Sequence, residues 1–218
     1  FLRYDLATGA FHDYGTTPPA EGLLTLGMDA PRRRLYGLTW PTGLLIRLDL
    51  DSGRIRSLGP VCRRGEAGSG SSYLCLCRAF AVVPDTGLVY FTLATGDIKR
   101  YDPESDAVTT VAHESMRRDV FGTWRPHTPG HQGYNWRDIL WHPQRGVFYG
   151  VHPKSAWLFQ FDPDGERLRL LDRICSQPLR ESGAFEPFRY GYLTLRLGHD
   201  GQPLYYLTGG PGRTQDGR

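Results

Sequence analysis

The stretch LIRLDLDSGRIRSLG, residues 45–59, reads as a strand, an aspartate, a short polar turn and a second strand. The same order of residue types recurs in FLRYDLATGAFHDYG (1–15), IKRYDPESDAVTTVA (98–112) and LFQFDPDGERLRLLD (158–172). The aligned aspartates are Asp5, Asp49, Asp102 and Asp162. An aspartate side chain accepts backbone N–H bonds at a turn, so we expect each segment to form a strand–turn–strand hairpin.

A second set of hairpins precedes three of these segments and recurs near the end of the chain. It comprises GMDAPRRRLYGLTW (27–40), AVVPDTGLVYFTLA (81–94), LWHPQRGVFYGVHP (140–153) and LGHDGQPLYYLTGG (197–210), centred on Tyr36, Tyr90, Tyr149 and Tyr205. These tyrosines are 54, 59 and 56 residues apart. Four short strands repeated at such a spacing predict four-stranded antiparallel sheets packed around an axis, which is a β-propeller.

The repeats divide the chain into blades of one all-β domain, residues 1–218. We expect a half blade at 1–15, complete blades at about 24–59, 78–112 and 136–172, and a half blade at 190–209. Phe1 begins inside a patterned strand, which favours a partial ring of a larger propeller. The alternative is a closed four-bladed ring in which the two half blades join.

The repeated pattern [LI]-x-R-[YL]-D-[LP]-x-[ST]-G, which follows strands of the LYG type, resembles propellers of the gluconolactonase, NHL and YVTN kind. It also resembles propeller polysaccharide lyases of the ulvan-lyase and oligogalacturonate-lyase type. The resemblance covers nearly the whole chain and implies the fold. It says less about function, because propellers host unrelated activities.

The composition excludes some classes of partner. Only Lys99 and Lys154 are lysines among 26 basic residues, so the chain is rich in arginine. A GC-rich bacterial genome explains this excess. The alternative is a preference for the planar guanidinium group, which binds carboxylate, sulfate or phosphate through two parallel N–H bonds. The net charge is +3 and no basic stripe is present, so we expect no nucleic acid partner. No apolar run is long enough to span a membrane.

The candidate site lies where long connections enter the inner strands, at the mouth of the central channel. His131, Tyr134 and Arg137 precede one inner strand, and ESGAFEPFRYGYLTL (181–195) brings Arg189, Tyr190 and Tyr192 to the next. His152 and Trp40 follow second strands on the same face. We expect His131, Tyr190 and His152 to be catalytic and Tyr134, Arg137, Arg189, Tyr192 and Trp40 to bind substrate. The competing interpretation is a set of loop residues that are solvated or wedged between blades.

This mixture of side chains suits an acidic oligo- or polysaccharide. Arg137 or Arg189 would neutralise a uronate carboxylate, His131 or Tyr190 would take the adjacent proton, and His152 would orient or act as an acid. The function predicted is therefore acidic-carbohydrate binding, with enzymatic activity left open but favoured as polysaccharide lyase chemistry. The alternatives are a non-catalytic scaffold for protein interaction and, third, a lactonase-type hydrolase.

Neither cofactor nor compartment is fixed by the sequence. No cofactor is predicted; the weaker alternative is a divalent metal held by His127, His131 and His152. A lyase would be secreted or periplasmic. Cys62 could form a disulfide with Cys75 or Cys77 in an exported protein, and otherwise these are unpaired buried thiols.

Overall fold

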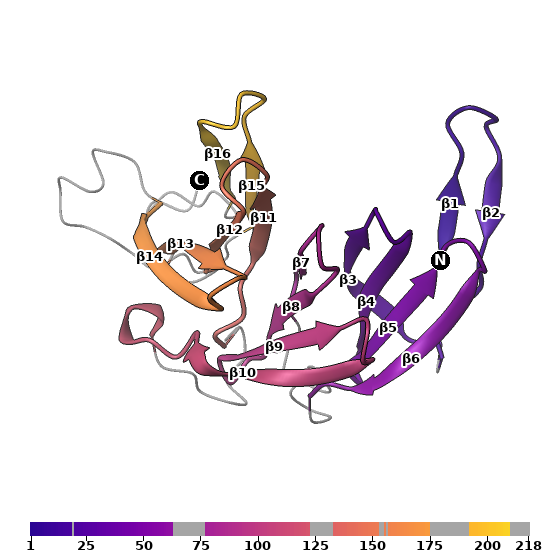
Figure 1. Ribbon diagram of the computed structural model, residues 1–218, viewed down its shortest axis with the longest axis horizontal. Helices are drawn as coiled ribbons and strands as arrows, with labels where there is room; N and C mark the ends of the chain where they lie inside the picture. Colours follow the sequence, from indigo (N-terminus) through magenta and orange to yellow (C-terminus); the bar gives the residue numbers. More distant parts are fainter. Residues whose placement is uncertain are drawn as a thin grey trace, which may run out of the picture.

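Antiparallel sheets make up most of this protein, whose computed structural model describes residues 1–18, 20–62, 77–122, 133–152, 155, 157–174 and 192–209 (Figure 1). The first complete sheet contains β3 (Gly22–Asp29), β4 (Arg34–Trp40), β5 (Leu44–Asp49) and β6 (Arg54–Pro60). The second contains β7 (Ala81–Val82), β8 (Val89–Thr92), β9 (Asp97–Asp102) and β10 (Ala107–Ser115). The third contains β11 (Asp138–His142), β12 (Val147–Val151), β13 (Trp157–Asp162) and β14 (Arg167–Arg173).

Two further hairpins lie at the ends of the arrangement. β1 (Leu2–Tyr4) pairs with β2 (Phe11–Asp13), and β15 (Tyr192–Leu197) pairs with β16 (Leu204–Gly209). They belong to separate two-stranded sheets and stand apart in Figure 1, so the described sheets form an open arc. The described sheets do not join into the closed four-bladed ring.

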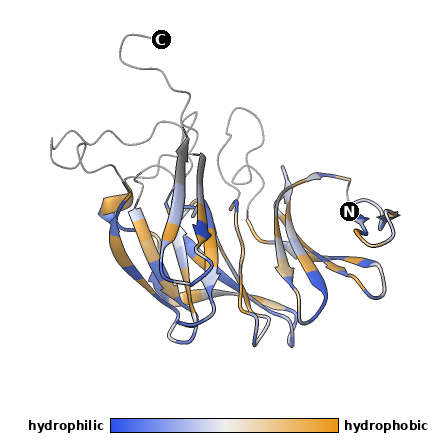
Figure 2. Cartoon of the chain, turned by 90° about the horizontal axis from the view of Figure 1, so that it is seen from above, coloured by the Kyte–Doolittle hydropathy of each residue, from blue (hydrophilic) through white to orange (hydrophobic). Residues whose placement is uncertain are grey.

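The predicted fold class is confirmed. The sheets are arranged like propeller blades, and the one helical element in the described part of the chain is a 3-10 turn, Asp119–Phe121. The innermost strands β3, β7, β11 and β15 follow one another as neighbours along the arc. Hydrophobic and hydrophilic residues alternate along several of the strands, as a half-buried sheet requires (Figure 2).

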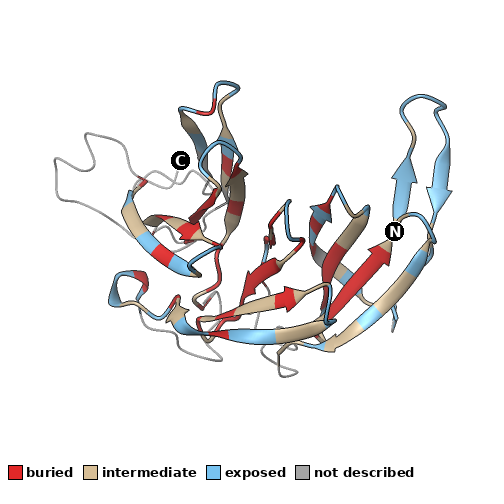
Figure 3. Ribbon diagram, viewed as in Figure 1, coloured by how far each residue is buried: buried red, intermediate tan, exposed pale blue. Residues whose placement is uncertain are grey.

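The core lies between successive sheets and is largely aromatic. The rings of Tyr36 and Tyr101 are 5.5 Å apart across the first junction, and those of Tyr90 and Phe161 are 5.0 Å apart across the second. Trp136 is fully buried and donates its indole N–H to the carbonyl of Ala79 at 2.8 Å. By contrast, the β1–β2 hairpin is exposed along both of its strands (Figure 3). Burial therefore concentrates where complete sheets face each other.

In three of the four hairpins, the side chain of the aligned aspartate accepts backbone N–H bonds from its own turn. Asp5 accepts backbone N–H bonds from Ala7 and Thr8 at 3.0 and 2.9 Å, and these bonds, that from Thr8 above all, lower the pKa of its carboxyl. Asp102 and Asp162 accept equivalent bonds from Glu104 and Asp164 at 2.9 and 3.0 Å. Asp49 departs from the expectation, because its side chain instead pairs with Arg34 at 3.0 Å and Arg47 at 3.4 Å. Arg34 on the neighbouring strand β4 and Arg47 on β5 itself thus bind the carboxylate that the turn would use.

The strand register follows the repeat. Tyr36 lies opposite Arg47, Tyr90 opposite Arg100 and Tyr149 opposite Gln160. In each sheet the residue opposite the tyrosine stands two positions before the aligned aspartate. Equivalent positions in different sheets can therefore be compared directly.

Candidate functional site

The two ends of the sheets differ in what they present. β4, β8 and β12 end, and β5, β9 and β13 begin, at one end, which we call the connection face. The tight turns that follow β3, β5, β9, β11 and β13 lie at the other end, which we call the hairpin face. Of the predicted site residues that the structure describes, His152 and Trp40 lie at the ends of β12 and β4 and Tyr134 and Arg137 precede β11, all at the connection face.

His152 is fully buried at the connection face, immediately after β12. Its Nε2 lies 3.3 Å from the carbonyl oxygen of Gly133, and its Nδ1 lies 2.8 Å from the hydroxyl of Ser155. A carbonyl only accepts, so Nε2 carries the hydrogen, and Nδ1 accepts from the Ser155 hydroxyl and more distantly from its backbone N–H at 3.3 Å. The ring also packs on Phe121 with centroids 4.6 Å apart. Of the two roles predicted for His152, this environment fits the orienting one.

Tyr134 lies beside the carbonyl that His152 holds. Its backbone N–H donates to Ala94 at 3.0 Å, and the preceding Gly133 has φ 61°, with a Cβ there meeting the Ala94 oxygen at 2.6 Å. Only glycine fits such a close approach in the left-handed region. His152 and Ala94 together therefore fix the segment that carries the half-buried Tyr134.

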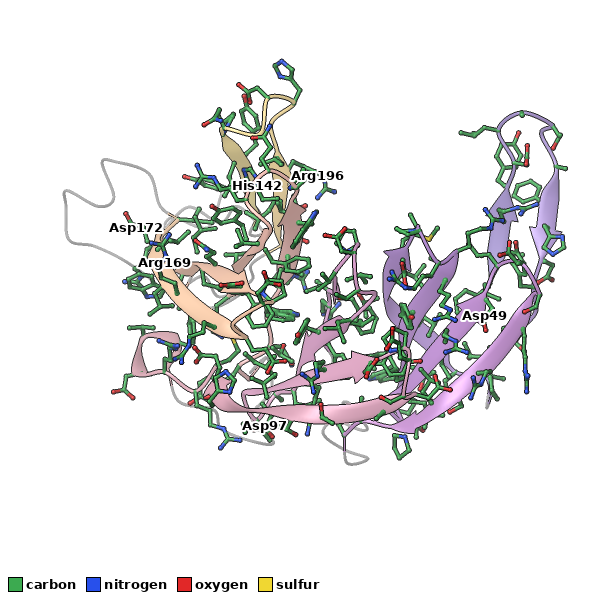
Figure 4. All side chains as sticks on the ribbon, in the orientation of Figure 1. Asp49, Asp97, His142, Arg169, Asp172 and Arg196 are labelled. Atoms are coloured by element: carbon green, nitrogen blue, oxygen red, sulfur yellow. The ribbon has the colours of Figure 1, made fainter. Side chains whose placement is uncertain are left out.

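Arg117 is a residue of this cluster that the sequence did not single out. It donates through Nε to the carbonyl of Thr95 at 2.5 Å and through Nη2 to Asp97, the residue labelled in Figure 4. A Cβ on Gly96 would lie 2.5 Å from Cγ of Arg117 and 3.3 Å from the Tyr134 ring, so the arginine stem and the tyrosine both pack close to this glycine. Its position in the sequence could have identified Arg117, because it stands at the start of a long connection between a predicted outer strand and the next inner strand.

The other predicted residues lie at different distances from this cluster. Arg137 is half-buried at the start of β11, and its backbone N–H donates to Val151 at 2.8 Å, next to His152. Trp40 ends β4 in the first sheet and is 43% exposed. Tyr192 opens β15, where only its backbone is described. His127, His131, Arg189 and Tyr190 lie outside the described residues.

A hollow of about 380 Å³ adjoins the cluster along β10, from Thr110 to Ser115, and is bounded by Asp97 and Arg117. Its lining is mixed in charge, because Glu114 and Asp97 stand with His113 and Arg117. Among the described residues no three His, Cys, Asp or Glu side chains group so as to hold a metal. Nor does any helix in that part of the chain have the length and apolar character to cross a membrane.

Comparison with known proteins places the chain by its fold. No protein-family model matches it. No curated protein sequence matches it either. Among solved structures it is similar to an auxiliary nutrient binding protein from Bacteroides thetaiotaomicron, with a TM-score of 0.52, 13% identity, and coverage of 86% of this chain and 36% of that one. It is also similar to Kuenenia stuttgartiensis hydrazine synthase, with a TM-score of 0.57 and 11% identity over 88% of this chain and 43% of that one.

A Bacteroides thetaiotaomicron protein of unknown function is similar as well, with a TM-score of 0.51 and 16% identity over 86% of this chain and 42% of that one. The chain spans less than half the length of each of these three structures. At such identities the likeness shows the fold alone. The neighbours are β-propeller-type proteins built from four-stranded antiparallel sheets, which is the architecture described above.

Proposed function

We propose that the chain is a binding propeller whose connection face holds an acidic carbohydrate. The observation that carries the proposal is that Arg117 and Tyr134 both pack close to Gly96. Asp97 and the Thr95 carbonyl orient the Arg117 guanidinium, so that it is presented in one geometry. A planar, oriented fork suits a carboxylate or sulfate, and an adjoining aromatic face suits a sugar ring.

Two further residues extend the same surface. Arg137 stands three residues after Tyr134, directly before β11, and Trp40 contributes an exposed indole from the first sheet. Several aromatic residues with a few placed charges are typical of small-molecule and oligosaccharide sites. The similarity in fold to a protein described as nutrient binding agrees with a binding role.

Lyase chemistry is the more specific form of this proposal. It assigns proton abstraction next to a uronate carboxylate to His131 or Tyr190, with Arg137 or Arg189 neutralising the carboxylate. In this proposal His152 has the orienting role. It donates to the carbonyl of Gly133 and thereby helps to position the adjacent Tyr134. Loss of a positioned acid or base would lower the rate by about 10²–10⁴-fold.

Calorimetry with ulvan and pectin fragments tests the binding proposal. We expect Arg137→Gln and Trp40→Ala to weaken binding about tenfold, the effect of losing one charge-assisted contact or one aromatic platform. The matched controls are Arg54→Gln and Phe11→Ala, exposed residues that lie away from the connection face and should leave binding unchanged. Absence of binding to every acidic glycan would reject the proposal and favour a protein-interaction scaffold.

The same glycans test catalysis when the unsaturated product is followed by its ultraviolet absorbance. A lyase whose activity falls in both His131→Ala and Tyr190→Phe supports the assigned roles. Activity that survives both substitutions removes these residues from the mechanism. Binding without product formation identifies a binding propeller that is not a lyase.

A further inference from the structure

The pairing of β9 with β10 contains an irregularity that the other complete sheets have only in a smaller form. Thr110 lies opposite Lys99 and Ser115 lies opposite Asp97, so four residues of β10 face a single residue of β9. The first and third sheets insert only one extra residue at the equivalent place. We call residues 111–114 the β10 bulge. Bulges are frequent beside functional sites, where they redirect side chains, so the longer insertion in the second sheet marks a candidate binding position.

The β10 bulge is held in place from both sides. Val111 is 5% exposed and belongs to the aromatic core. Glu114 accepts the backbone N–H of Leu168 in the third sheet at 2.9 Å. Nε2 of His113 lies 3.2 Å from the carbonyl oxygen of Gly165, also in the third sheet, and carries the hydrogen because a carbonyl only accepts. The bulge therefore has a shape that the core and the neighbouring sheet fix before any ligand binds.

The hollow of about 380 Å³ beside the connection-face cluster is formed by this bulge. Its lining comprises the bulge residues together with Asp97, Thr110, Ser115 and Arg117. The volume falls within the range of about 300–1,000 Å³ that is usual for small-molecule sites. Arg117 belongs both to this lining and to the place where it packs with Tyr134 close to Gly96. A molecule in the hollow would therefore lie next to one that is bound by Arg117 and Tyr134.

The charged groups of the lining are neutralised by the protein itself. Asp97 pairs with Arg117 and also accepts from the hydroxyl of Thr95 at 3.0 Å. Glu114 pairs with Arg118 at 2.7 Å. An anion in the hollow would meet two carboxylates that already have their counter-charges, and a cation would meet a guanidinium group that has its own. The hollow therefore favours an uncharged ligand.

The hydrogen-bonding groups that remain include both donors and acceptors. The hydroxyl oxygen of Thr110 accepts from Nζ of Lys99 at 2.5 Å, and that of Ser115 accepts from a backbone N–H at 3.2 Å, so both hydroxyl hydrogens are left to donate. Nε2 of His113 donates to the third sheet, so its Nδ1 is left to accept. Sugar hydroxyl groups offer donors and acceptors on adjacent carbons, whereas a carboxylate offers acceptors only.

We propose that the hollow at the β10 bulge holds a neutral sugar, beside the acidic sugar assigned to Arg117 and Tyr134. The inference rests on the proposed function and narrows its substrate to a heteroglycan in which a uronate is linked to a neutral sugar. The hydroxyls of Thr110 and Ser115 donate to the neutral sugar, and Nδ1 of His113 accepts from it. Nη1 of Arg117 donates to no group among the described residues, and it stays available for the carboxylate of the adjoining uronate.

Calorimetry on the 218-residue chain with two disaccharides tests the proposal. Galacturonosyl-rhamnose carries one uronate and one neutral sugar, and digalacturonate carries two uronates. We expect galacturonosyl-rhamnose to bind at least about tenfold more tightly, the size of one hydrogen bond. The second uronate of digalacturonate would bring its carboxylate toward Asp97 and Glu114, where a neutral sugar brings hydroxyl groups.

Variants of the β10 strand connect this preference to the hollow. Thr110→Val keeps the shape of the side chain and removes its hydroxyl, so it should weaken galacturonosyl-rhamnose binding about tenfold and leave digalacturonate binding unchanged. His113→Phe removes the acceptor and should act in the same way. The matched control is Thr109→Val, because Thr109 is an exposed neighbour on the same strand that does not line the hollow. It should change neither affinity.

The outcomes separate this inference from the proposed function. Equal binding of the two disaccharides, or tighter binding of digalacturonate, would overturn the neutral-sugar site and leave acidic-carbohydrate binding standing. A preference for galacturonosyl-rhamnose that survives both Thr110→Val and His113→Phe would also overturn it, because the hollow would not be its source. Absence of binding by both disaccharides would reject the two proposals together.

Discussion

Arg47 of β5 donates through Nη1 to Oδ1 of Asp106 at 2.9 Å, across the junction between the first two complete sheets. The arginine side chain is only 7% exposed, whereas that of Asp106 is 38% exposed. Tyr101 donates to the same oxygen at 2.6 Å and receives a bond from Arg47 at 2.9 Å. A buried cation is thus neutralised by an acid that reaches in from the solvent side.

Asp106→Asn should lower the free energy of unfolding by about 1–2 kcal/mol at neutral pH, because the buried Arg47 then loses the closer of its two carboxylates and keeps only Asp49 at 3.4 Å. Asp106 has φ 54°, a left-handed backbone that asparagine tolerates, so the change tests the charge rather than the turn. Urea denaturation measures the difference. Asp51→Asn is the control, since its pair with Arg33 is exposed to solvent and should contribute little to stability.

The difference in unfolding free energy between the wild type and Asp106→Asn should depend on pH. The hydrogen bond from Tyr101, followed by the nearby charges of Arg47 and Arg56, lowers the pKa of the Asp106 carboxyl in the folded state. A carboxyl with a lowered folded-state pKa stabilises the fold above its unfolded pKa of about 3.9. The stability gap between the wild type and Asp106→Asn should therefore be full at pH 6 (roughly two units above that value) and shrink as the pH falls through the folded pKa. A gap that grows on acidification would contradict this assignment.

Gly150→Ala should destabilise the third sheet by about 1–3 kcal/mol. A Cβ at this position in β12 would lie 2.4 Å from Cζ of Phe159 and 3.2 Å from the backbone oxygen of Asp138, so the aromatic ring must shift within a packed sheet. Thermal unfolding followed by circular dichroism measures the loss. Gly22→Ala is the matched control in a strand with open space around the new methyl group, and an equal loss there would show that Gly150 is not crowded.

Cys77 should resist alkylation until the protein unfolds. The thiol is free and fully buried, and its burial raises the pKa. It also contacts the carbonyl of Ala79 at 3.0 Å and the hydroxyl of Thr92 at 3.4 Å. Because the thiolate is the reactive form, iodoacetamide should modify Cys77 only in denaturant. Mass spectrometry of a chain with the other three cysteines replaced by serine checks this, and rapid modification without denaturant would contradict it.

The fold was predictable from the sequence because the repeat encodes register as well as strand type. The aligned tyrosine and the next aspartate are 12 or 13 residues apart in each complete repeat, and in the structure the tyrosine lies opposite the residue two positions before that aspartate, as with Tyr36 and Arg47. The exception is Asp49, whose carboxylate pairs with Arg34 on the neighbouring strand and with Arg47 on its own strand. A turn motif read locally cannot anticipate that a side chain from the opposite strand will bind its carboxylate.

The candidate site was less predictable, for a similar physical reason. Topology placed Tyr134, Arg137 and His152 at one end of the sheets, but the buried contact between His152 and Gly133 depends on how two loops pack. Arg117 was missed because no motif surrounds it; its position follows from the close approach at Gly96. The predictions for His131, Arg189 and Tyr190 stay predictions.

The carboxylates at Asp106 and Glu166 give the array a direction. Each reaches back to the sheet that precedes it in the chain, where Arg47 or Arg100 receives it. Arg47 and Arg100 stand at equivalent positions, so an acidic turn residue could keep this ion pair after either of the first two sheets. The equivalent position in the third sheet is Gln160, so a sheet with an acidic turn residue placed after it would lose the ion pair, and recombination between repeats would be penalised at that border.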